Sequence, residues 1–598
     1  MKMTRICGNA AEFAQSALHG YSLVHRDIVR MVRGGVVRAK PGRAGKVAVV
    51  VGGGSGHYPA FNGYVGTGFA DAAVAGDIFA SPSTQAIYSV ARRAERGGGV
   101  ILGFGNYAGD VLNFGIAAER LRREGIDTRL LATTDDVASA DVGDMARRRG
   151  IAGDMTVFRI VGAAAEAGLD LDAVEAVGRR ANSQTRTFGV AFEGCTLPGE
   201  ADLLFHVPKN RMALGLGVHG EPGIDEQDIP PPAQLAHVLF DRILKELPDD
   251  APRRVAIVLN GLGSTKHEEL FVLWEALAPL LAQAGLSVIA PLVGEYVTSL
   301  DMAGCSLTMT WLDEELERYW RAPVETAVLR HAGIMGEPGA TDGVMEEEPP
   351  VVHAQAATPA GQRGGLCVAE TMARLAQALA AAEGELGRID AVAGDGDHGQ
   401  GMARGSAAAR QAARQAAQAH AGAATVLAAA ADAWADRAGG TSGALWGEGL
   451  RAFSTALDDV SVPDAPQLAH GARYAMERIM QLGRARVGDK TLMDALVPFV
   501  ETLERECDQG HSLPDAWQAA ADAAQKAADA TRDLLPRMGR ARTHGARSLG
   551  HPDAGALSLA LCLRVAGEGM PLIEPVPVSM LPMGHMSEEN PVLDAFRS

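Results

Sequence analysis

Three aspartates lie within eight residues of one another in the segment RIDAVAGDGDHGQGMARG. Asp390, Asp395 and Asp397 place three carboxylates in a short glycine-containing loop, the last two on either side of Gly396. Hard oxygen ligands at this spacing suit Mg²⁺, which keeps its remaining coordination sites for water and phosphate oxygens. The spacing differs from that of an EF-hand loop, which needs a glutamate at its twelfth position. The pattern predicts a magnesium site, and the alternative is an aspartate turn that caps a helix.

Glycine-rich segments follow predicted strands in the first half of the chain. The first of them, GGGSGHYPAF, holds Gly54, Ser55, Gly56 and His57. Glycines at these positions let backbone N–H groups approach a small polar ligand without interference from a Cβ atom. The segment lacks the GK[ST] ending of a Walker loop, which disfavours a nucleotide P-loop. The alternative interpretation is a tight turn beside a buried histidine.

Two further glycine-rich segments each carry one residue that could act on a ligand. GFGNYAGDVLNF contains Asp110, and GLGVHGEPG contains His219 between two glycines. A histidine fenced by glycines is exposed on one side and free to approach a ligand, although a structural histidine in a simple turn is the alternative. NGLGSTKHEEL and TSLDMAGCS are candidate loops to which no chemistry is assigned.

Strands and helices must hold these segments, and the first half of the chain alternates the two patterns. Apolar, β-branched runs bounded by Gly, Pro or Asn occupy residues 47–51, 100–104, 254–259 and 287–292. Amphipathic helical patterns occupy residues 88–96 and 114–124. The alternation predicts an α/β domain.

The second half of the chain has a different character. The stretch TDGVMEEEPPVVHAQAATPAGQRGG has no sustained period and predicts an interdomain linker. Beyond it strand patterns almost vanish, and Ala-rich helical patterns cover residues 367–382, 404–438, 467–482, 492–506 and 514–535. We therefore predict an α/β domain, a linker, an all-helical domain and a C-terminal tail, over residues 1–337, 338–364, 365–572 and 573–598.

Bulk composition limits the class of protein. The 598 residues predict two or more domains, and 47% hydrophobic with 21% charged residues is typical of a soluble globular protein. The formal net charge of −18, without a long Lys/Arg run, argues against a nucleic-acid partner. The six cysteines form no C-x-x-C pair, and neither a signal peptide nor an uninterrupted apolar stretch of eighteen residues is evident. These features predict a cytoplasmic location and no membrane span.

Three more loops of the second half join predicted helices. They read AGGTSGALWGEG, GRARVGDKTLMDAL and GRARTHGARSLGHPDAGALS. Each offers backbone donors together with hydroxyls or a cation, groups that bind phosphates.

The ordered motifs GGGSGH, NYAGDVLNFG, GLGVHGEPG and TSLDMAGCS together resemble the substrate-binding domain of the dihydroxyacetone kinase family, over about residues 1–335. The aspartate loop and the three loops that follow it resemble the nucleotide-binding domain of the same family, over about residues 365–570. The resemblance implies an ATP-dependent kinase that phosphorylates a short-chain ketose such as dihydroxyacetone, erythrulose or apulose. It also implies that the helical domain is a closed barrel of antiparallel helices.

The resemblance assigns roles to residues of the first domain. By it, His219 attacks the ketone carbon and holds the substrate as a covalent hemiaminal, and Asp110 receives the proton of the hydroxyl that is phosphorylated. His57 hydrogen-bonds the substrate, beside the loop of Gly54, Ser55 and Gly56. A covalent bond would anchor and orient a small sugar, and its need for a carbonyl would reject glycerol.

In the second domain the resemblance implies that the three aspartates hold two Mg²⁺ ions that bridge the ATP phosphates. The implied ATP contacts are His398, Gly399, Gln400, Gly401, Thr441, Ser442, Gly483, Leu492, Arg540, Asp553, Ala554 and Gly555. The resemblance further implies a homodimer in which each helical domain serves the ketose site of the other subunit.

Three positions depart from the family pattern. Tyr58 stands where Glu is usual, Phe61 where His is usual, and Gly105 where Lys is common. We expect these changes to alter which hydroxyl pattern is accepted, so a four- or five-carbon ketose ranks level with dihydroxyacetone. Two alternatives remain open: a non-catalytic sugar-sensing co-regulator, and an FMN-cyclase activity on the same scaffold.

Overall fold

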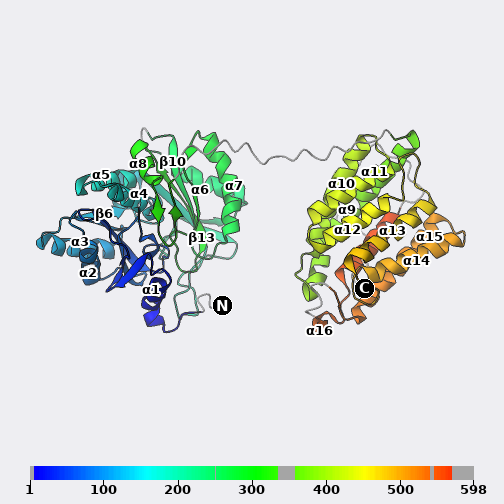
Figure 1. The fold of residues 1–598 in the computed structure, drawn as a ribbon, viewed down its shortest axis with the longest axis horizontal. Coiled ribbons are helices and arrows are strands. Elements are labelled where there is room, and N and C mark those ends of the chain that lie inside the picture. The colour runs from blue at the N-terminus through cyan, green and yellow to red at the C-terminus, as the bar shows by residue number, and fades with distance from the viewer. Residues whose placement is uncertain (1–5, 249–250, 334–356, 539–544, 569–598) are drawn as a thin grey trace. The chain divides into compact units, whose positions relative to one another are not determined.

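The chain divides into two compact units, residues 1–340 and 341–598. The structure is a computed structural model that describes residues 6–248, 251–333, 357–538 and 545–568. The first unit is α/β and the second is helical, which confirms the predicted fold classes (Figure 1). Within the described residues, no helix combines the length and the apolar character that a membrane crossing requires.

One six-stranded sheet carries the glycine-rich segment. Its strands lie in the order β1-β2-β4-β3-β5-β6, with bounds β1 (Val29–Val32), β2 (Gly35–Arg38), β3 (Ala48–Ser55), β4 (Ala72–Ile78), β5 (Val100–Gly105) and β6 (Thr128–Thr133). Strands β4, β3, β5 and β6 are parallel. Both faces of β3 are covered, which accounts for its continuous apolar start. Helices α2 (Thr84–Ala94) and α3 (Ala108–Arg123) pack on the outer face of this sheet.

A second, seven-stranded sheet completes the α/β unit. Its strands are β7 (Thr185–Glu193), β8 (Arg211–Leu214), β9 (Asp225–Asp228), β10 (Arg254–Gly261), β11 (Ser287–Val288), β12 (Leu292–Gly294) and β13 (Ala303–Trp311). Strands β7 to β10 and β13 pair antiparallel along the sheet, and β11 and β12 run parallel to β10. Helices α6 (Pro232–Leu244) and α7 (His267–Gln283) pack on its outer face.

Helix α4 (Gly153–Ala167) lies between the two sheets, and its residues from Gly153 to Ala165 are all buried. Small side chains make this close packing feasible: a Cβ atom at Gly162 would lie 2.0 Å from the carbonyl oxygen of Phe69. The remaining elements of the unit are α1 (Phe13–Val24), α5 (Leu171–Ser183), α8 (Glu314–Trp320), β14 (Val324–Glu325), β15 (Arg330–His331) and the 3₁₀ helices η1 (Ala10–Glu12), η2 (Asn62–Tyr64) and η3 (Val142–Arg147).

The helical unit is built around one apolar core. Its elements are α9 (Pro359–Ala393), α10 (His398–Gln418), α11 (Ala423–Ala438), α12 (Gly440–Ser454), α13 (Ala465–Gly483), α14 (Met493–Asp508), α15 (Leu513–Ala530), η4 (Thr531–Asp533), α16 (Gly545–Ser548) and α17 (Ala554–Gly567). From α9 to α15 each helix packs against the next, and α17 packs against both α15 and α9. The rings of Trp434 and Trp446 stack 5.1 Å apart in this core.

Several element boundaries differ from the sequence predictions. Helix α9 begins at Pro359, where the Thr358 hydroxyl accepts a hydrogen bond from the Gly361 N–H, so residues 359–364 are helical and not linker. The pattern at 404–438 is two helices, because His420 takes the left-handed conformation at φ 60° between them. The predicted strand at 287–292 is likewise two short strands, with Ala290 at φ 45° between them. The predicted tail lies outside the described residues.

A buried ionic cluster fixes the start of β3. The Asp71 carboxylate accepts hydrogen bonds from Lys46 Nζ at 2.5 Å, Arg38 Nη1 at 3.0 Å and the Val49 N–H at 2.9 Å. The side chains of Lys46 and Asp71 are 1% and 5% exposed. Glu166 also lies 2.9 Å from Arg38 and 3.7 Å from Lys46, but its side chain is 31% exposed, so Asp71 is the buried partner of Lys46. Removing Asp71 would therefore leave the Lys46 charge poorly compensated.

We expect Asp71→Ala to lower the free energy of unfolding of the α/β unit by up to about 3–5 kcal/mol, because the buried Lys46 ammonium is then left with the partly exposed Glu166 at 3.7 Å. Hydrogen–deuterium exchange of the β3 amides in urea measures the effect. Asp144→Ala is the matched control, since Asp144 forms an exposed pair with Arg147 at 3.2 Å and should cost less than about 1 kcal/mol. Equal effects of the two substitutions would contradict the proposed role of the cluster.

Candidate functional site

The predicted His57, Asp110 and His219 gather at the ends of strands from both sheets. His57 follows β3, and Asp110 lies in the first turn of α3, directly after β5. Strands β3 and β5 are parallel neighbours, so their carboxyl ends meet at one edge, where open α/β sheets bind ligands. His219 enters from the loop between β8 and β9 of the other sheet. Its Nε2 atom lies 3.0 Å from Nε2 of His57.

The ring of His57 is buried and fixed on its other side. Its Nδ1 atom donates to the carbonyl oxygen of Thr298 at 2.7 Å, and the Phe79 ring stacks on it at 5.0 Å. Burial, together with the neighbouring His219, lowers the pKa of His57 to about 3. His57 is therefore a neutral imidazole near pH 7.

Asp110 is a buried carboxyl group whose environment suits proton transfer. Its Oδ1 atom accepts a hydrogen bond from the Ser81 hydroxyl at 2.7 Å. Burial raises the pKa of Asp110 to about 6, against the opposing effects of the Ser81 hydrogen bond and of His219. A carboxylate with this pKa can accept a proton near neutral pH.

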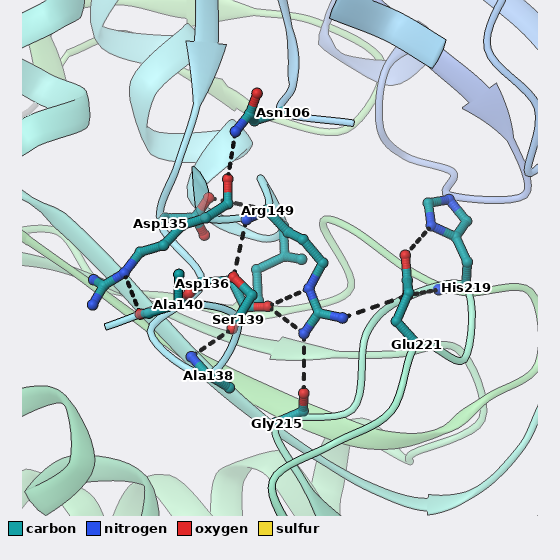
Figure 2. A network of polar contacts seen from close by, with 12 residues as sticks. Asn106, Asp135, Asp136, Ala138, Ser139, Ala140, Arg149, Gly215, His219 and Glu221 are labelled. Carbon is teal, nitrogen blue, oxygen red and sulfur yellow. Dashed lines mark hydrogen bonds and ion pairs between the residues drawn. The ribbon is translucent and has the colours of Figure 1, made fainter. Parts of the chain in front are cut away.

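A chain of charged side chains holds His219 in place, as Figure 2 shows. The Glu221 carboxylate accepts hydrogen bonds from Nδ1 of His219 at 3.0 Å and from the backbone N–H of His219 at 3.0 Å. Beyond Glu221, Nη1 of Arg149 lies 3.9 Å from Oε2 of that carboxylate. Arg149 in turn donates to Asp136 at 2.9 Å and to the Gly215 carbonyl at 3.2 Å.

Two aromatic rings border His219 as well. The ring centroids of Tyr107 and Phe79 lie 4.9 Å and 5.2 Å from that of His219, both edge-on. Phe79 has a left-handed backbone at φ 55°, which is uncommon for a non-glycine residue. These rings limit the approach to Nε2 of His219.

The glycines of the first motif serve protein packing as well as access. Gly54 and Ser55 belong to strand β3, so the predicted loop begins only at Gly56. A Cβ atom at Gly56 would lie 2.8 Å from the Phe79 ring, and one at Gly54 would lie 2.8 Å from the Ala80 nitrogen. The Ser55 hydroxyl donates to the Gly76 carbonyl at 2.6 Å. The glycines of this segment thus allow residues 79–80 to pack closely against it.

Two of the three departures from the family pattern lie together. Tyr58 and Phe61 line a cavity of about 530 Å³ beside α1, which Gly54, Ser55 and Gly56 also line but His57, Asp110 and His219 do not. That these aromatic residues alter which ketose is accepted stays a prediction. Gly105 does border the pocket, since a Cβ atom there would lie 3.2 Å from the Tyr107 ring.

In the helical unit the three predicted metal ligands come together. One carboxylate oxygen from each of Asp390, Asp395 and Asp397 lies within 4.8 Å of the others. Asp390, in the last turn of α9, also accepts from the backbone N–H groups of Gly396 and His398 at 2.9 Å and 3.4 Å. Asp390 therefore shapes the loop, while Asp395 and Asp397 are exposed. Three hard oxygen donors at these separations fit Mg²⁺.

Most of the predicted ATP contacts lie at helix ends. His398 to Gly401 form the first turn of α10, Thr441 and Ser442 the first turn of α12, and Ala554 and Gly555 the first turn of α17; Gly483 ends α13, and Leu492 and Asp553 cap α14 and α17. Helix N-termini present unpaired N–H groups that bind phosphate. Arg540 lies outside the described residues.

Two of these helix starts contact each other. Nε2 of His398 lies 2.9 Å from the Ser558 hydroxyl, which links the starts of α10 and α17. Burial raises the pKa of Asp553 to about 7, with the nearby carboxylates of Asp494 and Asp390 adding to the shift. The structure thus places the aspartate loop and the α17 start within electrostatic range of each other.

Several residues of the site carry no sequence signal or only a weak one. Glu221 lies inside the quoted motif GLGVHGEPG, two residues from His219, and a carboxylate so close to a histidine was a usable signal. Arg149, Thr298 and Phe79 come from distant segments that only the folded chain brings to the histidines.

Comparison with known proteins agrees with this geometry. The Dak1 domain model matches residues 19–328 and the DAK2 domain model matches residues 392–568. D-erythrulose kinase of Mycolicibacterium smegmatis is 53% identical over 95% of this chain and 98% of its own length. L-erythrulose kinase of Pectobacterium atrosepticum is 52% identical over 94% of this chain and 95% of its own length.

A solved structure matches both domains within one chain. The dihydroxyacetone kinase from C. freundii in complex with AMP-PNP and Mg²⁺ aligns with 94% of this chain and 99% of its own, at 31% identity and a TM-score of 0.57. Both domain models and full-length relatives thus match one continuous chain. The protein therefore belongs to the dihydroxyacetone kinase family, in the form that joins a Dak1 and a DAK2 domain.

Proposed function

We propose that this protein transfers the γ-phosphate of ATP to a terminal hydroxyl of a short-chain ketose, with a four-carbon ketose such as erythrulose as the leading candidate. The observation that carries the proposal is the convergence of the buried His57 and Asp110 with the partly exposed His219 in a family member. The names of the full-length relatives support erythrulose over dihydroxyacetone.

The pocket supplies the groups that this reaction needs. Nε2 of His219 attacks the ketone carbon and anchors the sugar as a hemiaminal, which orients the terminal hydroxyl. Asp110 accepts the proton of that hydroxyl as the phosphoryl group transfers. The bond of Asp110 to Ser81 holds the carboxylate in place before substrate arrives.

The helical unit supplies the phosphoryl donor. We propose that Asp390, Asp395 and Asp397 hold two Mg²⁺ ions, which would neutralise charge on the ATP phosphates. The starts of α10, α12 and α17 offer N–H groups to those phosphates. The contacts of α17 with both α15 and α9 support the closed helical barrel that the family resemblance implies.

A ketose panel tests the activity. We expect ATP to be converted to ADP with D-erythrulose, L-erythrulose or dihydroxyacetone, and not with glycerol, which has no carbonyl for His219. At saturating ATP, kcat/KM for the ketose should fall as pH drops through about 6, because Asp110 then gains a proton and can no longer act as base. Asp110→Asn should lose about 10²–10⁴-fold in activity and this acidic limb.

The panel also decides between the alternatives. ADP release with no ketose, or formation of cyclic FMN, would favour the cyclase, and no turnover under any condition would favour a non-catalytic co-regulator. Asp110 and the three aspartates are all present here, whereas a purely sensory protein has no need of them.

Paired variants separate ketose capture from phosphoryl transfer. We expect Asp395→Asn to lose most Mg²⁺-dependent turnover yet still show His219 bonded to the ketose in a crystal soaked with substrate. His219→Ala should retain ATP binding and lose the bonded sugar. Electron density for an unattached ketose beside an intact His219 would contradict the hemiaminal, and full turnover of Asp395→Asn at limiting Mg²⁺ would contradict the metal assignment.

We also propose a homodimer in which each helical domain serves the ketose site of the other subunit, as the family resemblance implies. Mixing His219→Ala chains with Asp395→Asn chains should then restore turnover, because one pairing joins an intact ketose site to an intact nucleotide site. Each variant incubated alone is the control. No recovery after confirmed subunit exchange would show that transfer takes place within one chain.

A further inference from the structure

The other hydrogen-bond partners of His57 and His219 determine which nitrogens of the two rings carry a hydrogen. The Thr298 carbonyl can only accept, so Nδ1 of His57 carries a hydrogen. The Glu221 carboxylate can likewise only accept, so Nδ1 of His219 carries one too. Two neutral rings would then present bare lone pairs to each other. A hydrogen bond across the 3.0 Å between the Nε2 atoms needs one added proton, which makes the pair an imidazole beside an imidazolium.

The surroundings decide which nitrogen accepts across this pair. Burial lowers the pKa of His57 to about 3, so Nε2 of His57 is the acceptor. Although burial opposes its ionisation, hydrogen bonding to His219 lowers the pKa of Glu221 to about 2. Glu221 is thus an ionised carboxylate that accepts the hydrogen on Nδ1 of His219. If Glu221 turned away, a neutral His219 would keep its single hydrogen on Nε2, where His57 accepts it, and Nε2 would have no lone pair for a ketose.

The orientation of Glu221 depends on the groups behind it. Arg149 lies 3.9 Å from Oε2 of Glu221 and is itself fixed by the buried Asp136, whose carboxylate it meets at 2.8 Å. A Cβ atom at Gly217 would lie 2.0 Å from Oε2 of Glu221 and 2.6 Å from Nη1 of Arg149. Gly217 therefore leaves the space that Glu221 and Arg149 fill. Figure 2 shows these two side chains facing each other.

We propose that Arg149 is a positioning residue of this enzyme: held by Asp136, it fixes Glu221, which keeps a hydrogen on Nδ1 of His219 and leaves Nε2 able to bond a ketone carbon. The proposal deepens the ketose-kinase function given above and rests on it. Arg149 contacts Asp136, the Gly215 carbonyl and Glu221, and it acts on His219 through the Glu221 carboxylate.

The step that this arrangement serves balances in atoms and charge. The shared proton moves to Nε2 of His57 as the ketose enters, and the freed lone pair on Nε2 of His219 forms the bond to the carbonyl carbon. The π electrons of the carbonyl pass to its oxygen, which takes the proton from His57. His57 ends neutral, and the positive charge stays on the alkylated His219 ring, against the carboxylate of Glu221.

Nitrogen NMR of histidine-labelled protein tests the proposal without substrate. Long-range ¹H–¹⁵N spectra distinguish a protonated from an unprotonated ring nitrogen, and His219→Ala identifies the His219 signals. In the unsubstituted protein we expect Nδ1 of His219 to be protonated. In Arg149→Met and in Glu221→Gln we expect the unprotonated Nδ1 signal of the other tautomer. Arg149→Lys, which keeps the charge but not the two-point contact with Asp136, should lie between them.

Kinetics provide the second readout. Arg149→Met should lower kcat/KM for the ketose by about tenfold to a hundredfold, the usual effect of removing a partner that orients a functional histidine, and leave KM for ATP unchanged. Arg147→Met is the matched control, because the exposed Arg147 lies two residues away and, among the described residues, forms its ion pair with Asp144 at 3.2 Å. It should change neither readout.

The outcomes separate this proposal from the function on which it rests. A protonated Nδ1 of His219 that persists in both Arg149→Met and Glu221→Gln overturns the positioning role, whether or not a ketose is phosphorylated. If the Nδ1 signal changes as expected while the unsubstituted protein phosphorylates no ketose, the positioning of His219 is supported and the proposed substrate class is overturned. Should Arg149→Met fail to fold, Arg149→Lys and Glu221→Gln carry the same test.

Discussion

Helix α4 is buried on every face from Gly153 to Ala165, and the α/β unit is organised by that constraint. A helix buried on all sides must satisfy apolar contacts from two sheets at once, which explains its run of small residues and the absence of a Cβ atom at Gly162. The helix, about 10–12 Å across with its side chains, keeps the strands of the two sheets apart. Loops at the ends of the strands still meet, since His57 contacts Thr298 and His219.

The sequence is informative where a signal is local. The apolar runs predict β5 and β10 at nearly their observed bounds, because buried parallel or central strands need continuous apolar residues. The sequence is less informative where one backbone angle determines whether a helix continues. At His420 a left-handed conformation divides one helical pattern into α10 and α11. The start of α9 at Pro359 was predictable from Thr358 and the proline, a common helix-start combination.

The candidate site shows the same division between local and distant information. The chemically active side chains His57, Asp110 and His219 stand out by residue type and by flanking glycines. Their supporting groups do not, since Arg149 and Thr298 reach the histidines only through the packing of distant segments. The glycine-rich pattern predicts access for a ligand. In the structure, Gly54, Gly56 and Gly217 are each needed for close contacts within the protein. A glycine-rich motif therefore marks close packing first, and a ligand only when reactive side chains accompany it.

The charged groups of the two units differ in their contact with solvent. Arg149 and Asp136 have side chains 15% and 2% exposed, whereas Asp395 and Asp397 are exposed at the surface of the helical unit. Dissolved ions screen exposed charges over about 8–10 Å at ordinary ionic strength and screen buried pairs far less. Added salt should thus weaken the electrostatic field at the aspartate loop and leave the arrangement around His219 almost unchanged. Ionic strength thus acts on the exposed aspartate loop and spares the buried pair of Arg149 and Asp136.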